Sequence, residues 1–307
     1  MIKSVNSKKK VLTKSSTERG WHLNSTWQST AENQLEIKFE NCTTLGGGDF
    51  ASSYKVVTND QTTLFVKTHA NPPPAFFTTE ATGLRWLRAT GTVNIPEVLG
   101  VNDQPPYLAL AWVEPGAANA GTEVSLGRQL AALHLHKQGN FGREDLATTG
   151  SLAVPNQPCE SWCEFYATQR LMPLIKLAAS RQTLAVKELS GLGKIASRLS
   201  GLNVPEESAS LLHGDLWAGN RLVDQRGDSW LIDPAAHCGH REFELGMMTL
   251  FGGYTEACFA AYHESYPLSP GWQERLPLHQ LAPLIVHAIK FGGSYKAAVM
   301  DAMARYV

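Results

Sequence analysis

The hydrophobic periodicity of this 307-residue chain changes about a third of the way along. In the first part, short runs alternate apolar and polar residues as half-buried strands do, and in the rest the apolar residues recur at helical spacing. We expect strands at 35–39, 53–57, 63–67, 95–101 and 107–113, and helices at 76–91, 124–136, 162–179, 183–199 and from 244 onward. Short strand-like runs at 211–212 and 230–232 interrupt the helical part. Strands followed by helices predict an α+β protein with a β-rich and a mainly helical lobe.

The pattern predicts three segments. Residues 1–34 form a basic, polar extension that lacks the apolar stretch of a secretory signal. We expect it to be a flexible, solvated tail, with a transit peptide as the alternative. Residues 35–113 form the β-rich lobe and residues 114–307 the helical lobe, with a hinge at 114–121.

Composition and charge exclude several classes of protein. A formal net charge of -1 argues against a nucleic-acid partner, and no apolar run is long enough to span a membrane. The five scattered cysteines fit reduced thiols in a cytoplasmic protein better than a disulfide framework. His237, Cys238 and His240 have ligand-type side chains but lack a fourth partner at regular spacing, so a zinc site is not expected.

The stretch 211–220, LLHGDLWAGN, has the spacing of a catalytic loop. In H-x-D-x-x-x-x-N, the pattern of kinase catalytic loops, the aspartate accepts the proton of the attacking hydroxyl and the asparagine binds a metal ion. Here these residues are His213, Asp215 and Asn220. Asp233 ends the apolar run 230–232 and offers a second oxygen ligand, which suits Mg²⁺. We expect Gly214 and Gly219 to let the loop fold tightly.

Further upstream the chain carries residues that could hold a nucleotide. Gly46, Gly47 and Gly48 lie between two expected strands, where backbone N–H groups could approach a phosphate, although a plain hairpin is the simpler interpretation of three glycines alone. Lys67 ends an expected strand, and Glu80 in the next helix is its natural acidic partner. The order of glycine turn, strand lysine, helix glutamate, Asp/Asn loop and metal aspartate is that of a kinase-like fold.

Several longer stretches resemble the fructosamine kinase (ketosamine 3-kinase) family, a branch of the aminoglycoside-phosphotransferase-like kinases with a protein-kinase-like fold. The stretches are 213–220 (HGDLWAGN), 232–235 (IDPA), 239–242 (GHRE) and 250–254 (LFGGY), with weaker similarity at 80–84, 126–134 and 162–166. The resemblance spans about residues 38–300. Departures include His240 and Glu244, where an aspartate is common, and Ala111, where a glutamate is usual; they concern sugar specificity rather than phosphoryl transfer.

The resemblance implies an ATP- and Mg²⁺-dependent kinase that phosphorylates the 3-hydroxyl of a free or protein-bound ketosamine, which would serve the repair of glycated proteins. Asp215 would be the catalytic base, Asn220 and Asp233 would bind the metal, and Lys67 would hold the phosphates. The adenine would bind near the hinge, at Ala111, Trp112, Val113 and Glu114. His213, Trp217, Arg241 and Glu242 are candidates for the substrate pocket, with a purely structural role as the alternative for each. Two other functions stay open: a kinase of another small hydroxylated or amino compound, and a nucleotide-binding protein without turnover.

Overall fold

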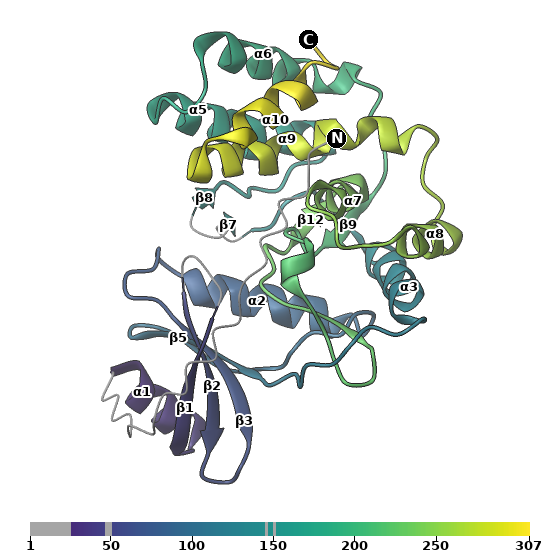
Figure 1. Cartoon of the computed structure of the whole chain (residues 1–307). Coiled ribbons are helices and arrows are strands. Elements are labelled where there is room, and N and C mark those ends of the chain that lie inside the picture. The colour runs from purple at the N-terminus through teal and green to yellow at the C-terminus, as the bar shows by residue number, and fades with distance from the viewer. Residues whose placement is uncertain (1–25, 47–50, 145–146, 150–151) are drawn as a thin grey trace.

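The computed structural model describes residues 26–46, 51–144, 147–149 and 152–307, which form two lobes (Figure 1). The N-terminal lobe is an antiparallel sheet in the order β1-β2-β3-β5-β4. Its elements are α1 (Thr26–Leu35), β1 (Phe39–Leu45), β2 (Ser52–Thr58), β3 (Thr63–Thr68), α2 (Phe76–Ala89), β4 (Val98–Asp103) and β5 (Pro106–Ala111).

The two faces of this sheet are covered by different helices. On β5, Tyr107 and Ala109 pack with α1, whereas Leu108 and Leu110 pack with α2, because successive side chains of a strand point to opposite faces. Lys67 on β3 contacts Glu80 of α2, so it lies on the α2 face. In Figure 1, α2 lies between the sheet and the C-terminal lobe.

The expected flexible extension is wrong for residues 26–34. These residues form helix α1, in which Trp27 and Ala31 are buried against the sheet. The expected strand 35–39 is shifted as well, because α1 continues to Leu35 and β1 begins at Phe39. Residues 1–25 lie outside the described residues.

The C-terminal lobe is mainly helical, as expected. Its helices are α3 (Thr122–His134), α4 (Trp162–Phe165), the π-helix η1 (Tyr166–Leu171), α5 (Met172–Ser180), α6 (Val186–Ser197), the 3₁₀ turns η2 (Leu199–Gly201) and η3 (Ala218–Asn220), α7 (Arg241–Leu250), α8 (Glu256–Ser265), α9 (Trp272–Phe291) and α10 (Ser294–Met303). Small antiparallel sheets join β6 (Lys137–Gln138), β9 (Ala209–Leu212) and β12 (His237–Gly239); β7 (Ala147–Thr149) and β8 (Leu152–Val154); and β10 (Arg221–Val223) and β11 (Ser229–Leu231).

One hydrophobic core continues from lobe to lobe. Phe77 and Leu84 of α2 belong to the same buried cluster as Leu130 of α3, Leu211 of β9 and Leu245 of α7. Burial of apolar surface is the main favourable contribution to folding, so this shared cluster holds α2 against the segment that follows β9. The lobes are therefore joined by packing as well as by the chain between β5 and α3.

No helix in the described ranges is both long enough and apolar enough to cross a bilayer. All five cysteines are free thiols.

Candidate active site

The segment between β9 and β10 folds into a tight loop around Asp215 and Asn220. The Nδ2 group of Asn220 donates to the backbone carbonyl of Asp215 at 2.9 Å, to Asp215 Oδ2 at 3.1 Å and to the backbone carbonyl of Asp233 at 3.4 Å. Gly214 permits the turn: its φ is +84°, and a Cβ there would lie 2.2 Å from the carbonyl oxygen of Ala235. The amide of Asn220 thus ties the loop to the segment that contains Asp233.

His213 orients this loop. Its Nε2 group lies 2.9 Å from the carbonyl oxygen of Ile232, and its Nδ1 accepts the backbone N–H of Asp215 at 3.3 Å. Burial lowers the pKa of His213 to about 4, so the ring is neutral at physiological pH. It does not line the cavity described below, and both of its nitrogens are engaged. The structure therefore supports an orienting role for His213 and not contact with substrate.

Glu244 supports the loop from beneath. This carboxyl on α7 is fully buried and accepts the backbone N–H of Gly214 at 2.9 Å. Burial raises the pKa of Glu244 to about 8, so at neutral pH the group is largely protonated. Glu244 thus fixes the backbone next to Asp215 without placing a second full negative charge there.

Lys67 joins the two lobes electrostatically. Its Nζ lies 2.8 Å from Glu80 Oε1 and also forms an ion pair with Asp233 Oδ1. Burial acts to lower the pKa of Lys67, but the charges of Asp233 and Glu80 outweigh it and raise the pKa above its ordinary value. Asp233 has a φ of +57°, a conformation that non-glycine residues rarely adopt and that occurs preferentially at functional sites. The expected Lys67–Glu80 pair is present, and Asp233 completes it.

The pKa of Asp215 is raised to about 7 because the carboxyl is buried, although the hydrogen bond from Asn220 partly offsets this effect. A carboxyl with a pKa near neutral pH can both accept and release a proton, as a general base must. Lys290 on α9 contributes a positive charge that acts in the same direction as Asn220.

One cavity of about 800 Å³ lies between the lobes. Its walls carry Lys67 and Glu80 from the N-terminal lobe and Asp215, Asn220 and Asp233 from the C-terminal lobe. The volume lies in the range of sites for cofactors and drug-sized ligands. Asp215 and Asp233, thus brought together, could serve chemistry on a bound molecule.

The donor set fits a magnesium ion. Mg²⁺ prefers a few protein oxygens together with phosphates and water. The Nδ2 group of Asn220 faces Asp215, which leaves its Oδ1 as an oxygen ligand, and Asp233 offers a half-exposed carboxylate at the same place. Asn220 and Asp233 are thus suited to hold the ion, as the sequence predicts.

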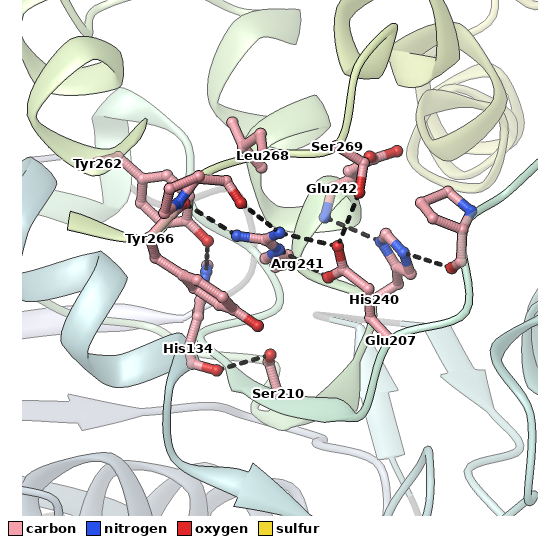
Figure 2. Close-up of polar contacts among 12 residues, drawn as sticks. His134, Glu207, Ser210, His240, Arg241, Glu242, Tyr262, Tyr266, Leu268 and Ser269 are labelled. Atoms are coloured by element: carbon pink, nitrogen blue, oxygen red, sulfur yellow. Dashed lines mark hydrogen bonds and ion pairs between the residues drawn. The ribbon is translucent and has the colours of Figure 1, made fainter. Parts of the chain in front are cut away.

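Arg241 and Glu242 belong to a network of polar contacts that Figure 2 shows. Arg241 Nε donates to Glu207 Oε2 at 2.6 Å, and its guanidinium lies 3.6 Å from the ring centre of Tyr266. Glu242 is fully buried and pairs with Arg275 at 2.6 Å. Neither residue lines the cavity, so the structure supports the structural alternative for both.

His240, Glu242 and His279 form the one group of three potential metal ligands found among the described residues. The nitrogens of His240 are already engaged, since Nδ1 accepts the N–H of Glu242 at 3.2 Å and Nε2 lies 3.2 Å from the carbonyl oxygen of Pro205. Glu242 is neutralised by Arg275. The cluster is therefore a buried polar network in which Arg275 already supplies the positive charge beside Glu242.

The remaining nucleotide-site predictions stay predictions. Gly46 lines the cavity, whereas Gly47 and Gly48 lie outside the described residues. The residues expected to bind adenine, Ala111, Trp112, Val113 and Glu114, follow or end β5 and do not line the cavity. Within the hinge, Trp112 Nε1 donates to Glu114 Oε2 at 2.7 Å.

Trp217 lines the cavity with 40% of its surface exposed, as a substrate-pocket residue would. Sequence analysis did not assign several other lining residues. They are basic or aromatic and come from segments far apart in the chain: Arg143, Arg170, His237, His287, Lys290 and Phe291. No local sequence signal marks Arg170 or Phe291.

Two lobes, a cavity between them and the Lys67–Glu80, Asp215–Asn220 and Asp233 arrangement define a phosphotransferase with a protein-kinase-like fold. The sequence profile described as fructosamine kinase matches residues 21–307. The chain therefore belongs to the fructosamine kinase family.

Individual relatives agree with this assignment. An Enterococcus faecium protein assigned as a ketoamine kinase is 35% identical over 82% of this chain and 90% of its own length. The chloroplastic protein-ribulosamine 3-kinase of Arabidopsis thaliana is 31% identical over 86% of this chain and 81% of its own length. Among solved structures, a Thermobifida fusca protein assigned as a fructosamine-3-kinase superposes with a TM-score of 0.85 at 35% identity, covering 91% of this chain and 97% of that one.

Proposed function

We propose that this protein transfers the γ-phosphoryl group of ATP to the 3-hydroxyl of a ketosamine, either a fructosamine or a ribulosamine, in the repair of glycated amines in the cytoplasm. The observation that carries the proposal is that Asp215 lines the same cavity as the Lys67–Asp233 ion pair. Asp215 supplies a base for the acceptor hydroxyl, and the Lys67–Asp233 pair supplies charge for the nucleotide. The names of the relatives support the ketosamine as acceptor.

The reaction follows from the positions of the side chains. Asp215 accepts the proton of the substrate hydroxyl while the hydroxyl oxygen bonds to the γ-phosphorus of ATP. The bond from that phosphorus to the bridging oxygen breaks, and ADP leaves. Lys67 binds phosphate oxygens, and Glu80 holds the lysine in place at 2.8 Å. A magnesium ion on Asn220 and Asp233 would neutralise phosphate charge. Positioning and charge stabilisation thus provide most of the acceleration.

The test is incubation with ATP, Mg²⁺ and a panel of acceptors. The panel holds a fructosamine, a ribulosamine, an aminoglycoside and choline, and the phosphorylated carbon is assigned by NMR. We expect phosphate on the third carbon of the ketosamines. Phosphorylation of the aminoglycoside or choline alone would contradict the proposed acceptor while leaving the kinase assignment intact.

The role of Asp215 has its own variant. Asp215→Asn keeps the shape of the side chain but removes the base, so turnover should fall by about 10²–10⁴-fold while ATP still binds. Asp301→Asn, on an exposed position of α10, is the matched control and should turn over as the wild type does. Equal turnover by Asp215→Asn and wild type would show that another group is the base.

A further inference from the structure

A buried arginine on the cavity wall has no acidic partner among the residues that the structure describes. Arg170 belongs to the π-helix η1, is 3% exposed and lines the cavity that contains Asp215. Its guanidinium donates to the carbonyl oxygens of Pro155 at 2.6 Å and Gln169 at 3.1 Å and to Asn156 Oδ1 at 2.8 Å. All three acceptors are neutral, and no carboxylate in the described part of the chain forms an ion pair with Arg170.

This arrangement fixes a positive charge and leaves it unneutralised. Burying a charge is costly unless an opposite charge compensates it. Burial lowers the pKa of Arg170 to about 9, so the group still carries its charge at neutral pH. The ring of Phe165, 4.5 Å from the guanidinium, and the three acceptors hold it in one orientation. The Nδ2 group of the adjoining Asn156 is also buried and has no hydrogen-bond partner among the described residues.

The wall around Arg170 is mostly apolar. The lining residues from β8, α5, α7 and α9 include Val154, Leu174, Phe243, Met247, Ala282 and Val286. Among the described residues, the carboxylates that line the cavity are Glu80, Asp215 and Asp233, and two of these pair with Lys67. The lining also includes the cations Lys67, Arg143 and Lys290, and Lys67 is already paired with two carboxylates. Arg170, held among apolar side chains, matches a ligand that ends in an anionic group and has an otherwise uncharged body.

We propose that Arg170 binds the carboxylate of the acceptor, so that the enzyme favours ketosamines formed on free amino acids over those formed on uncharged amines. This inference rests on the proposed function, because it assigns the end of the ketosamine that lies away from the reacting hydroxyl. Arg170 is then a specificity-determining residue: it recognises the amino-acid part and takes no part in phosphoryl transfer.

The test compares two ligands of nearly equal size, N-fructosylglycine and N-fructosylglycinamide, on the full-length protein. Isothermal titration calorimetry gives Kd, and a coupled assay gives kcat and KM. A charge-assisted hydrogen bond contributes about 1.5–3 kcal/mol, so the wild type should bind the acid about 10–100-fold more tightly than the amide. Arg170→Gln should remove this preference, leaving Kd for the amide, KM for ATP and kcat within about twofold of wild type.

Arg181→Gln, at the exposed end of α5, is the matched control and should keep the preference. If Arg170→Gln does not fold, the affinities of the wild type for the acid and the amide still test the proposal, and equal affinity for both ligands overturns it. A raised KM for ATP in Arg170→Gln would assign the arginine to the nucleotide and also overturn it. The anion that Arg170 binds could be the carboxylate of the amino acid or a phosphate on the sugar. A third ligand, the 6-phosphate of N-fructosylpropylamine, separates these two cases, because tighter binding of this ligand than of the acid would refute the carboxylate assignment.

Calorimetry separates this proposal from the proposed function. If the acid binds more tightly than the amide but neither is phosphorylated, the subsite stands and the reaction is wrong. If both are phosphorylated with equal kcat/KM and bind equally, the reaction stands and the subsite is wrong.

Discussion

Replacement of Glu244 by glutamine should change how the stability of the protein depends on pH. The ordinary pKa of 4.5 is raised to about 8 in the folded protein, so the folded state holds the proton more tightly than the unfolded state does. The contribution of Glu244 to stability is therefore greatest below pH 4.5 and is lost as the pH rises toward 8. Each pH unit in that window lowers the free energy of unfolding by about 1.4 kcal/mol. By pH 7 the wild type has therefore lost about 3 kcal/mol of stability that a side chain without a titrating group would keep.

Urea denaturation of the wild type and Glu244→Gln at pH 5, 6, 7 and 8 measures this effect. Between pH 5 and pH 8, the free energy of unfolding of the variant should rise relative to that of the wild type by up to about 4 kcal/mol, since glutamine does not titrate. Its carboxamide oxygen can still accept the N–H of Gly214, so kcat should stay within about threefold, whereas Glu244→Leu should lower it further. Glu256→Gln, on the exposed start of α8, is the control. A constant difference between wild type and Glu244→Gln at every pH would refute the claim that burial keeps this carboxyl protonated.

Three further substitutions test the packing. A Cβ on Gly127 would lie 2.1 Å from the carbonyl oxygen of Cys258, so Gly127→Ala should push α3 and α8 apart and cost about 1–3 kcal/mol in urea denaturation. Arg275→Met leaves the buried carboxylate of Glu242 without its cation and should lower the free energy of unfolding by about 3–5 kcal/mol at pH 7. Burial alone would raise the pKa of Glu242, but contacts with His279 and Arg275 lower it to about 2, so the cost should shrink as the pH falls from 4.5 toward 2; a cost that stays constant over this range would contradict the ion pair. Trp27→Ala should cost about 3–5 kcal/mol by calorimetry if α1 is part of the folded unit, and no change in Tm would show that it is not.

Helix α1 shows why the N-terminal boundary could not be predicted. Its sequence, TWQSTAENQL, is polar apart from Trp27, Ala31 and Leu35, which lie four residues apart along one stripe. A helix of 10 residues is marginal on its own, and tertiary packing supplies most of its stability. The sheet face that receives Trp27 is built from β2, β3 and β5, so the signal lies outside the segment itself.

Spacing along the chain was sufficient for the catalytic loop. The positions of His213, Asp215 and Asn220 fix a short loop whose polar groups must hydrogen-bond to one another or to the adjoining segment, and Asp233 follows within the same antiparallel unit. The strand lysine and the helix glutamate were likewise predictable as a pair, because Lys67 and Glu80 are separated by a short proline-rich connection. These contacts are local or follow from one hairpin-like arrangement.

The sequence by itself determined the main strands and helices after α1, the spacing of the loop 213–220 and the family, since each depends on residue types at short, fixed spacings. Only the tertiary structure decided which of the candidate residues reach the cavity: it removed His213, Arg241 and Glu242 and added Arg170. The physical reason is that burial and charge pairing depend on neighbours that are distant in sequence. Whether an arginine is neutralised, as Arg241 is by Glu207, or has only neutral hydrogen-bond acceptors in the described part of the chain, as Arg170 has, appears only when those neighbours are in place.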